Sequence, residues 1–381
     1  MSPAWKMVRV LLGVSVGLWA MMKVHAVMAA GTENPGEFDH RDVFPLDRAA
    51  LDRLRQMVGV EGPKKQWAEP VIAAGRRALG ATPKPLKRIN YEGLLNTNPS
   101  RIETVKSLRT MNDVADAFRA WQLTGGDEFA EFTRRSILAW AQTYVPTGND
   151  VNENKLTPLV VAFTGLRESF EAGDREEVER WLGRMADLHA AETAKVTRFT
   201  NRYTKRLRFL ALLGLALDRR DLLDAAGKGV RVFVRNSLRP DGTSFDLEER
   251  DTLTYHCSAL EAALDTIQLT ASNPETVYAW GSPAGGSVKK SVEYVVPYAM
   301  GEKERREWEN TRIALDRRRA EAGIATYQPG KLFDPEYALP MLRKAARIDR
   351  SLEKVAYPAE GVLTEDAAYD RLISEVLRSG G

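Results

Sequence analysis

Apolar residues recur at three- and four-residue spacing along almost the whole chain after residue 50. This spacing places side chains on one face of an α-helix, whereas the alternating pattern of half-buried strands is nearly absent. Turns rich in Gly, Pro, Asn or Asp, such as TGGD and GSPAGGS, separate the apolar runs. The pattern predicts helices over 51–58, 67–79, 102–123, 129–144, 156–170, 178–195, 203–217, 222–238, 256–269, 288–299, 302–322, 337–348 and 366–377.

A series of twelve or thirteen helices with short connections leaves few single-domain architectures, namely a solenoid, a large bundle or a toroid of paired helices. No sequence repeat of fixed period is present, which argues against a solenoid. The sequence therefore predicts an all-α fold, an (α/α)-toroid of antiparallel helix pairs around a cleft. We expect this single domain to span 46–381, preceded by an extended lead-in over 31–45.

The first thirty residues have the composition of a secretory signal. Lys6 and Arg9 precede an apolar run over 10–22, and small residues suited to cleavage follow at Ala26 and Ala29. The run is shorter than the about 20 residues that span a bilayer. We expect a signal peptide over 1–30 and a periplasmic or secreted protein without stable membrane insertion after its removal. Because Lys23 interrupts the pattern, an uncleaved N-terminal anchor is the alternative.

Export changes the interpretation of charge. The chain has 55 Lys and Arg against 52 Asp and Glu, but Lys6, Arg9 and Lys23 lie in the predicted signal. The remainder is formally neutral, so the overall pI of 8.8 does not indicate a nucleic-acid partner. Any attraction to a polyanion has to come from a local cluster of basic residues.

Cysteine and histidine usage gives no sign of a disulfide or a metal. Cys257 is the one cysteine, so no intramolecular disulfide can form, and we expect it to be a small buried residue. Beyond the predicted signal the histidines are His40, His189 and His256, and no two have HxH or HxxxH spacing. We expect no metal and no organic cofactor.

The segment 241–264, DGTSFDLEERDTLTYHCSALEAAL, concentrates candidate chemistry. Seven groups able to move or stabilise protons fall within eleven positions, directly before an Ala- and Leu-rich helical pattern. They are Asp246, Glu248, Glu249, Arg250, Asp251, Tyr255 and His256. A polar cluster that leads into a buried helix is typical of a functional site. The alternative is a solvated acidic loop ahead of a helix.

A second cluster is TNRYTKRLR at 200–208. If a helix begins near residue 200, Asn201, Lys205 and Arg208 share one face, and Arg202 and Arg206 share the neighbouring one. Four cations within seven residues suit carboxylate binding. A solvated helix face is the alternative.

Two loops add polar residues. Tyr91 and Glu92 lie in a loop between helical stretches, and the loop GNDVNENK at 148–155 offers three asparagines and Lys155. These residues can form hydrogen bonds with a hydroxyl-rich ligand. Ordinary turn and cap chemistry is the alternative, and for each single asparagine it is the better interpretation.

Five segments in order resemble alginate-lyase-like proteins, which are polysaccharide lyases with an (α/α) toroid fold. They are YEGLLNTNPSRIETVKSL, AWAQTYVPTGNDVNENKLTPL, NRYTKRLRFL, DLEERDTLTYHCSALEAAL and KKSVEYVVPYAMGEKERREW. The resemblance covers roughly residues 85 to 325. It also implies export, in agreement with the predicted signal.

The resemblance implies β-elimination of a polyuronate, in which a neutraliser binds the carboxylate, a base removes the C5 proton and an acid protonates the O4 leaving group. Asn201 matches the family's asparagine and Tyr255 its tyrosine. Arg202 stands where better-studied members hold histidine. Aligned on Tyr255, Asp251 lies near a position where the family often has arginine, with Arg250 one residue away.

These matches imply a set of roles. Tyr255 serves as base and acid, which requires the proton and the leaving group to lie on one face of the sugar. Asn201 and Arg202 neutralise the carboxylate. His256, Lys205 and Arg250 assist, and Tyr91, Glu92 and Lys155 line the substrate groove.

Two other functions stay open from sequence. Glu248, Glu249 and Asp251 could supply the paired carboxylates of a glycoside hydrolase on the same architecture. A non-catalytic carbohydrate-binding protein is the other possibility, since the family histidine is absent. All three functions have a polysaccharide partner, anionic in the case of the lyase.

Overall fold

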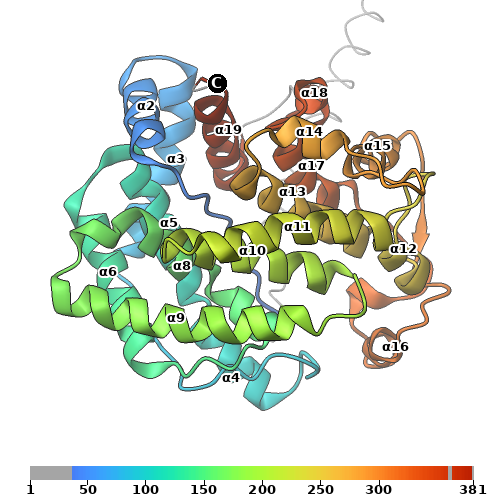
Figure 1. Cartoon of the computed structure of the whole chain (residues 1–381), viewed down its shortest axis with the longest axis horizontal. Coiled ribbons are helices and arrows are strands. Elements are labelled where there is room, and N and C mark those ends of the chain that lie inside the picture. The colour runs from blue at the N-terminus through green and yellow to red at the C-terminus, as the bar shows by residue number, and fades with distance from the viewer. Residues whose placement is uncertain (1–36, 359–362, 380–381) are drawn as a thin grey trace, which may run out of the picture.

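A computed structural model describes residues 37–358 and 363–379, and the predicted signal peptide lies outside them. The described chain is almost entirely helical (Figure 1). The α-helices are α2 (Arg48–Gly59), α3 (Pro63–Ala78), α4 (Pro99–Leu108), α5 (Thr110–Thr124), α6 (Asp127–Thr143), α7 (Asp150–Glu153), α8 (Thr157–Leu166), α9 (Ala172–Ala194), α10 (Asn201–Ala216), α11 (Arg220–Ser237), α12 (Phe245–Arg250), α13 (Leu253–Thr270), α14 (Pro274–Ala279), α15 (Val288–Ala299), α16 (Ala314–Glu321), α17 (Leu339–Ala346), α18 (Glu353–Ala356) and α19 (Glu365–Arg378). Short 3₁₀ helices are η1 (Asn154–Leu156), η2 (Arg167–Ser169), η3 (Ala325–Tyr327), η4 (Pro335–Ala338) and η5 (Arg350–Leu352), and two strands, β1 (Arg306–Glu307) and β2 (Lys331–Leu332), pair antiparallel.

Many helices begin at a residue whose side chain accepts a hydrogen bond from the first turn, which satisfies a backbone N–H that has no partner within the helix. Asn98 caps α4, and Ser287 caps α15. The same chemistry fixes the region of the predicted site, where Ser244 caps α12 and Thr252 caps α13. A tight turn at Asp251 and Thr252 joins α12 to α13, with Asp251 in the left-handed conformation at φ 55°.

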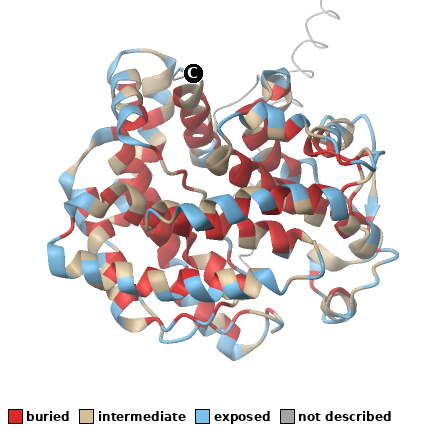
Figure 2. Cartoon of the chain, viewed as in Figure 1, coloured by how far each residue is buried: buried red, intermediate tan, exposed pale blue. Residues whose placement is uncertain are grey.

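The helices pack in pairs around a closed ring. α5, α8, α10 and α13 bury most of their length, whereas α9 and α11 bury one face and expose the other (Figure 2). α10 packs against α11 and α13, α3 packs against α5, and α19 returns to pack against α3. The last helix thus closes the ring onto the first part of the chain, as Figure 1 shows at α19 and α3. This arrangement confirms the predicted toroid.

The segment before α2 crosses the interior of the ring without forming a helix. Phe38, Val43, Phe44 and Leu46 are buried along it. Its backbone polar groups find partners on the helices, since Phe44 N donates to the Tyr369 hydroxyl and Phe44 O accepts from the Gln122 amide. The segment therefore belongs to the core, and it carries residues 37–41 toward the start of α10.

Two predicted helices differ from the structure. The run predicted over 102–123 is divided at Arg109 into α4 and α5. The run predicted over 302–322 is wrong in its first half, which forms β1 and an irregular turn in which Trp308 has φ 66°. In the part of the chain that the structure describes, no helix combines the length and apolar character needed to cross a membrane.

Candidate functional site

Asn201 is the first residue of α10, and its side chain has no hydrogen-bond partner in the described structure. Its backbone N–H donates to Asp246 Oδ2 at 2.5 Å, which fixes the start of the helix. Its side-chain Oδ1 is buried and unpaired although the residue is 5% exposed. A buried polar group without a partner is unfavourable unless a ligand or water satisfies it. The amide is therefore available to a substrate.

Arg202, one position along, is already occupied. Its Nε and Nη2 donate to the two carboxylate oxygens of Asp150 at 2.9 and 2.6 Å, and its Nη1 lies 2.7 Å from Glu92 Oε1. Arg206, on the same helix face, also binds Asp150 at 2.7 Å. Burial raises the pKa of Asp150, but the hydrogen bonds and charges of Arg202 and Arg206 outweigh it and lower the pKa. Arg202 thus ties α10 to α7 and to the loop at Glu92.

A second basic group lies on the other face of α10. Lys205 forms no hydrogen bond or ion pair with the described residues, and among the surrounding charges Asp39 and Lys155 act on it most strongly. Burial lowers the pKa of Lys205, opposed by the charge of Asp39. Lys155 Nζ donates to Phe38 O at 2.6 Å and lies 3.4 Å from Asp39 Oδ1. Lys205 is therefore a cation without a fixed partner, one helical turn from Asn201.

Tyr91 contacts both Phe38 and Lys155. Its phenol exchanges hydrogen bonds with the backbone of Phe38, and its ring lies under two cations, Arg101 at 3.8 Å and Lys155 at 4.9 Å. The residue is buried. Tyr91 consequently positions Lys155 and the segment at Phe38, and Glu92 holds Arg202 and Asn149.

Tyr255 lies in the first turn of α13 within a group that we call the tyrosine cluster. Its members are Tyr255, Tyr327, Arg250, Arg319 and Asp316. The two phenol oxygens are 3.1 Å apart, and Arg319 Nη1 donates to both, at 3.3 Å for Tyr255 and 2.9 Å for Tyr327. The Arg250 guanidinium lies 4.0 Å above the Tyr255 ring and binds Asp316 at 2.8 Å.

Asp246 connects the start of α10 with the tyrosine cluster. It accepts the Asn201 N–H and lies 4.0 Å from Arg250 Nε. Burial raises the pKa of Asp246 to about 7, while the charge of Arg250 and the hydrogen bond from Asn201 act in the opposite direction. Through this single buried carboxyl, Asn201 and Tyr255 are held on one contiguous set of contacts.

The remaining carboxylates of the 246–251 region are paired with arginines. The pairs are Glu248 with Arg239, Glu249 with Arg198, and Asp251 with Arg305. Asp251 also accepts the N–H of Asn310 at 2.9 Å. These groups fasten the turn between α12 and α13 to neighbouring segments, and they do not form a free pair of carboxylates.

His256 does not reach the surface. It is fully buried, with Nδ1 2.7 Å from the Ser244 hydroxyl and Nε2 3.2 Å from Ser291 O. Burial lowers its pKa to about 4. The predicted assistance to Tyr255 therefore does not fit the geometry, because successive residues of a helix point about 100° apart. Its neighbour Cys257 is buried too.

The asparagines of the 148–155 loop have structural partners. Asn149 caps α7, Asn152 donates to Ile89 O, and Asn154 donates to Asp150 O. The turn and cap interpretation is therefore correct for all three. In the described residues, no group of His, Cys, Asp or Glu is arranged to hold a metal ion.

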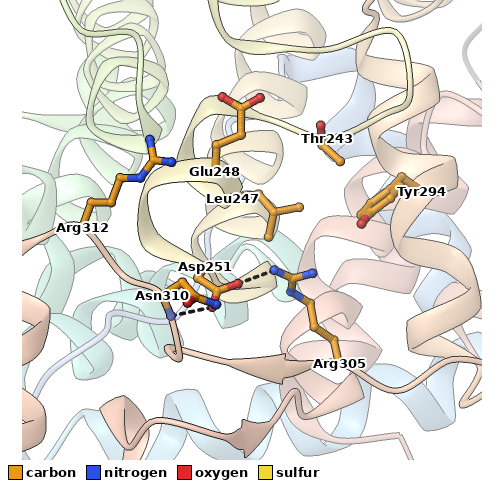
Figure 3. Close-up of a pocket in the computed structure, with 8 residues that line it drawn as sticks. All are labelled: Thr243, Leu247, Glu248, Asp251, Tyr294, Arg305, Asn310 and Arg312. Atoms are coloured by element: carbon orange, nitrogen blue, oxygen red, sulfur yellow. Dashed lines mark hydrogen bonds and ion pairs between the residues drawn. The ribbon is translucent and has the colours of Figure 1, made fainter.

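A cavity of about 300 Å³ lies on the far side of the turn between α12 and α13 (Figure 3). It is lined by Thr243, Leu247, Glu248, Asp251, Tyr294, Arg305, Asn310 and Arg312. In Figure 3, Asp251 points across to Arg305 and Asn310, so its carboxylate is engaged by the wall of the cavity itself. Glu248 and Asp251, two of the carboxylates considered for a hydrolase, lie in this lining, but none of the residues predicted to carry β-elimination does, and we do not assign the reaction to this cavity.

Sequence reasoning missed Arg319, Tyr327 and Asp316. The segment that holds them was predicted in part as a helix, and no local pattern pairs residues 64 and 72 positions from Tyr255. The sequence also did not predict that Asp39 and its neighbour His40 lie near Lys155 and the basic residues of α10. Burial lowers the pKa of His40 to about 4, and the nearby charges of Arg208 and Lys155 act in the same direction.

Comparison with known proteins identifies the family. The family model described as alginate lyase matches residues 57–306, and a search of curated proteins gave no match. An alginate lyase from Bacteroides ovatus has a similar structure, with a TM-score of 0.61, 14% identity and coverage of 86% of this chain and 97% of that chain. Alginate lyase A1-III from Sphingomonas species A1 has a TM-score of 0.54 and 15% identity, covering 76% of this chain and 92% of that chain. A variant of alginate lyase A1-III complexed with a tetrasaccharide has a TM-score of 0.53 and 17% identity, covering 66% and 76%. At these identities the solved structures establish the fold, and the family match over more than half of the sequence shows that this chain belongs to the alginate lyase family of polysaccharide lyases.

Proposed function

We propose that this lyase is exported and cleaves a uronic-acid-containing, alginate-like polysaccharide by β-elimination, with Tyr255 transferring the proton. The observation that carries the proposal is the contact set that joins Asn201 to Tyr255. Asn201 offers an unpaired amide, and Asp246 and Arg250 connect it to a phenol that has two guanidiniums beside it.

The groups that bind the uronate carboxylate can be inferred from the side chains that have no hydrogen-bond or ion-pair partner among the described residues. Asn201 and Lys205 have no fixed partner in the described structure, so they are suited to bind the uronate carboxylate. Arg202 is 44% exposed but already donates to Asp150 and Glu92. We therefore assign Arg202 a structural role at the start of α10. It adds positive charge there, but its guanidinium has no free pair of N–H groups for the uronate carboxylate.

Tyr255 then takes the C5 proton and returns it to O4. Binding of the carboxylate by Asn201 and Lys205 stabilises negative charge that develops at C5. The C5–H electron pair forms the C4–C5 double bond, and the C4–O bond breaks with its electrons on O4. Because one phenol serves both proton transfers, the C5 proton and O4 have to lie on the same face of the sugar. This geometry favours mannuronate and glucuronate over guluronate and galacturonate.

The two alternatives are tested in the same experiment. The purified protein is supplied with polymers of mannuronate, glucuronate, guluronate or galacturonate, and ultraviolet absorbance and reducing ends are followed together. β-Elimination gives absorbance from the new double bond in step with reducing ends. Reducing ends without absorbance indicate hydrolysis, and binding without either product indicates a non-catalytic protein; both results refute the proposal.

Export rests on the composition of residues 1–30. Mass spectrometry of the protein recovered from the periplasm or medium of an expressing cell should give a chain that begins after Ala26 or Ala29. A full-length chain retained in the membrane fraction would instead support the uncleaved anchor.

A further inference from the structure

The segment that follows the family match supplies part of the surroundings of Tyr255. The match ends at residue 306, and Trp308, Arg319 and Tyr327 all lie beyond it. Trp308 packs edge-on against the Tyr255 ring at 5.8 Å and against Tyr327 at 4.9 Å.

This segment is fastened to the beginning of α13 by backbone and side-chain contacts. Glu307 accepts from Leu253 N at 2.6 Å and from the Thr252 hydroxyl at 2.8 Å. The Trp308 N–H donates to Asp251 O at 2.9 Å. These contacts hold Trp308 beside the start of α13, and Tyr327 packs against Trp308 with ring centroids 4.9 Å apart.

The hydrogen bonds among Tyr255, Tyr327 and Arg319 have a defined sense. Arg319 is only a donor, so both phenol oxygens accept from it. Between the two phenols one hydroxyl has to donate to the other, across 3.1 Å. Burial, together with the negative charge of an ionised Tyr255, raises the pKa of Tyr327 above its ordinary value. When the Tyr255 oxygen is ionised it can only accept, so the Tyr327 hydroxyl is then the donor.

Charge in the cluster favours an anionic oxygen. Arg250 and Arg319 bring two positive charges to the phenols, and Asp316 supplies one negative charge, at 2.8 Å from Arg250 and 3.5 Å from Arg319. Asp246 also lies 4.0 Å from Arg250, but burial raises its pKa to about 7 and so favours its neutral form. Burial is the main cause that lowers the pKa of Arg101, and the positive charge of Arg319 acts in the same direction. A net positive environment stabilises a phenolate.

We propose that Tyr327 and Arg319 are positioning residues for Tyr255, which hold its oxygen as the phenolate that removes the C5 proton. This proposal rests on the proposed β-elimination. The Tyr255 phenol first loses its proton to solvent. The phenolate then takes the C5 proton, and the resulting phenol gives that proton to O4. Tyr327 donates its hydrogen bond throughout and keeps its own proton.

The test compares Tyr327→Phe with wild type on the polymer that wild type cleaves. The substitution keeps the ring against Trp308 and removes the donor hydroxyl. We expect kcat to fall about 10- to 100-fold with KM changed less than about threefold, because the loss affects a charge formed in the reaction. The rising limb of the kcat/KM profile should move to higher pH, which a merely structural role would not produce. Tyr337→Phe, at an exposed tyrosine, is the matched control.

A second variant, Arg319→Lys, keeps the inference testable if Tyr327→Phe does not fold. Arg319→Lys keeps the charge but cannot reach both oxygens in the same way, so a smaller loss of kcat is expected.

The outcomes separate this inference from the proposed function. If wild type forms the double bond while Tyr327→Phe keeps kcat within twofold and an unshifted pH profile, the inference is refuted and the lyase function stands. If wild type forms no double bond from any polymer, the proposed function itself fails and this inference fails with it.

Discussion

Tyr255 is held on three sides by groups that do not depend on its hydroxyl. Arg250 covers one face of the ring, Trp308 contacts its edge, and the backbone is fixed by the Thr252 cap of α13. The hydroxyl itself contacts Tyr327 and Arg319. The groups that position the ring are thus different from those that contact the hydroxyl. A substitution that removes only the hydroxyl therefore tests its chemical role.

Tyr255→Phe should abolish turnover with little change in stability. We expect kcat to fall at least about 100-fold, because the proton-transfer group is lost. The free energy of unfolding should change by less than about 1 kcal/mol, since a half-buried hydrogen bond contributes about that much. Steady-state kinetics and denaturant titration measure the two effects. An active variant would place the base elsewhere.

At the scale of elements, the start of α10 is fixed by a carboxyl that is buried at a cost. Asp246 is 1% exposed, and its Oδ1 has no hydrogen-bond partner in the described structure. Since burial raises its pKa to about 7, the folded protein favours the protonated form. The unfolded chain releases the proton near pH 4, so the contribution of this group to stability is full below that pH and is lost as pH rises to about 7.

Asp246→Asn should remove this dependence while still accepting the Asn201 N–H. Relative to wild type, the variant should gain about 1 to 3 kcal/mol of unfolding free energy between pH 5 and pH 8. Denaturant titrations at the two pH values measure the difference. The exposed Asp52→Asn serves as control. A constant difference between the variant and wild type at both pH values would contradict the raised pKa.

The helices also show how much of the structure the sequence predicts. Helical periodicity predicted the toroid, and the spacing on α10 separated Arg202 and Arg206, which both bind Asp150, from Lys205. Periodicity failed over the first half of 302–322 because the polar run there folds by pairing with the turn after α12, through contacts distant in sequence. The same distance hid Tyr327, whose partner is 72 residues away. Which arginine is free and which is occupied depends on such contacts and not on residue type.

At the scale of the whole molecule, a buried charge cluster joins the segment before α2 to α13 and α17. Lys344 on α17 is 2% exposed and contacts three carboxylates, Asp42 at 2.8 Å, Glu261 at 2.8 Å and Asp265 at 2.6 Å. Burial lowers the pKa of Lys344, but these carboxylates outweigh it and raise the pKa. The lysine thus fastens the interior segment to the helices of the ring.

Lys344→Met should destabilise the whole domain. Removing one partner of a buried ionic cluster leaves charges without compensation, which costs about 3 to 5 kcal/mol. The midpoint of denaturant unfolding should fall accordingly, whereas the exposed Lys354→Met should leave it unchanged. Equal midpoints for the two variants would show that the cluster does not stabilise the ring.

The most direct test of the central claim is the mass of the products formed from a mannuronate polymer in oxygen-18-labelled water. β-Elimination adds no water, so each cleavage should give a new non-reducing end lighter by one water and free of label. Products with a saturated new non-reducing end, heavier by one labelled water per cleavage, would contradict the account, because they would require hydrolysis.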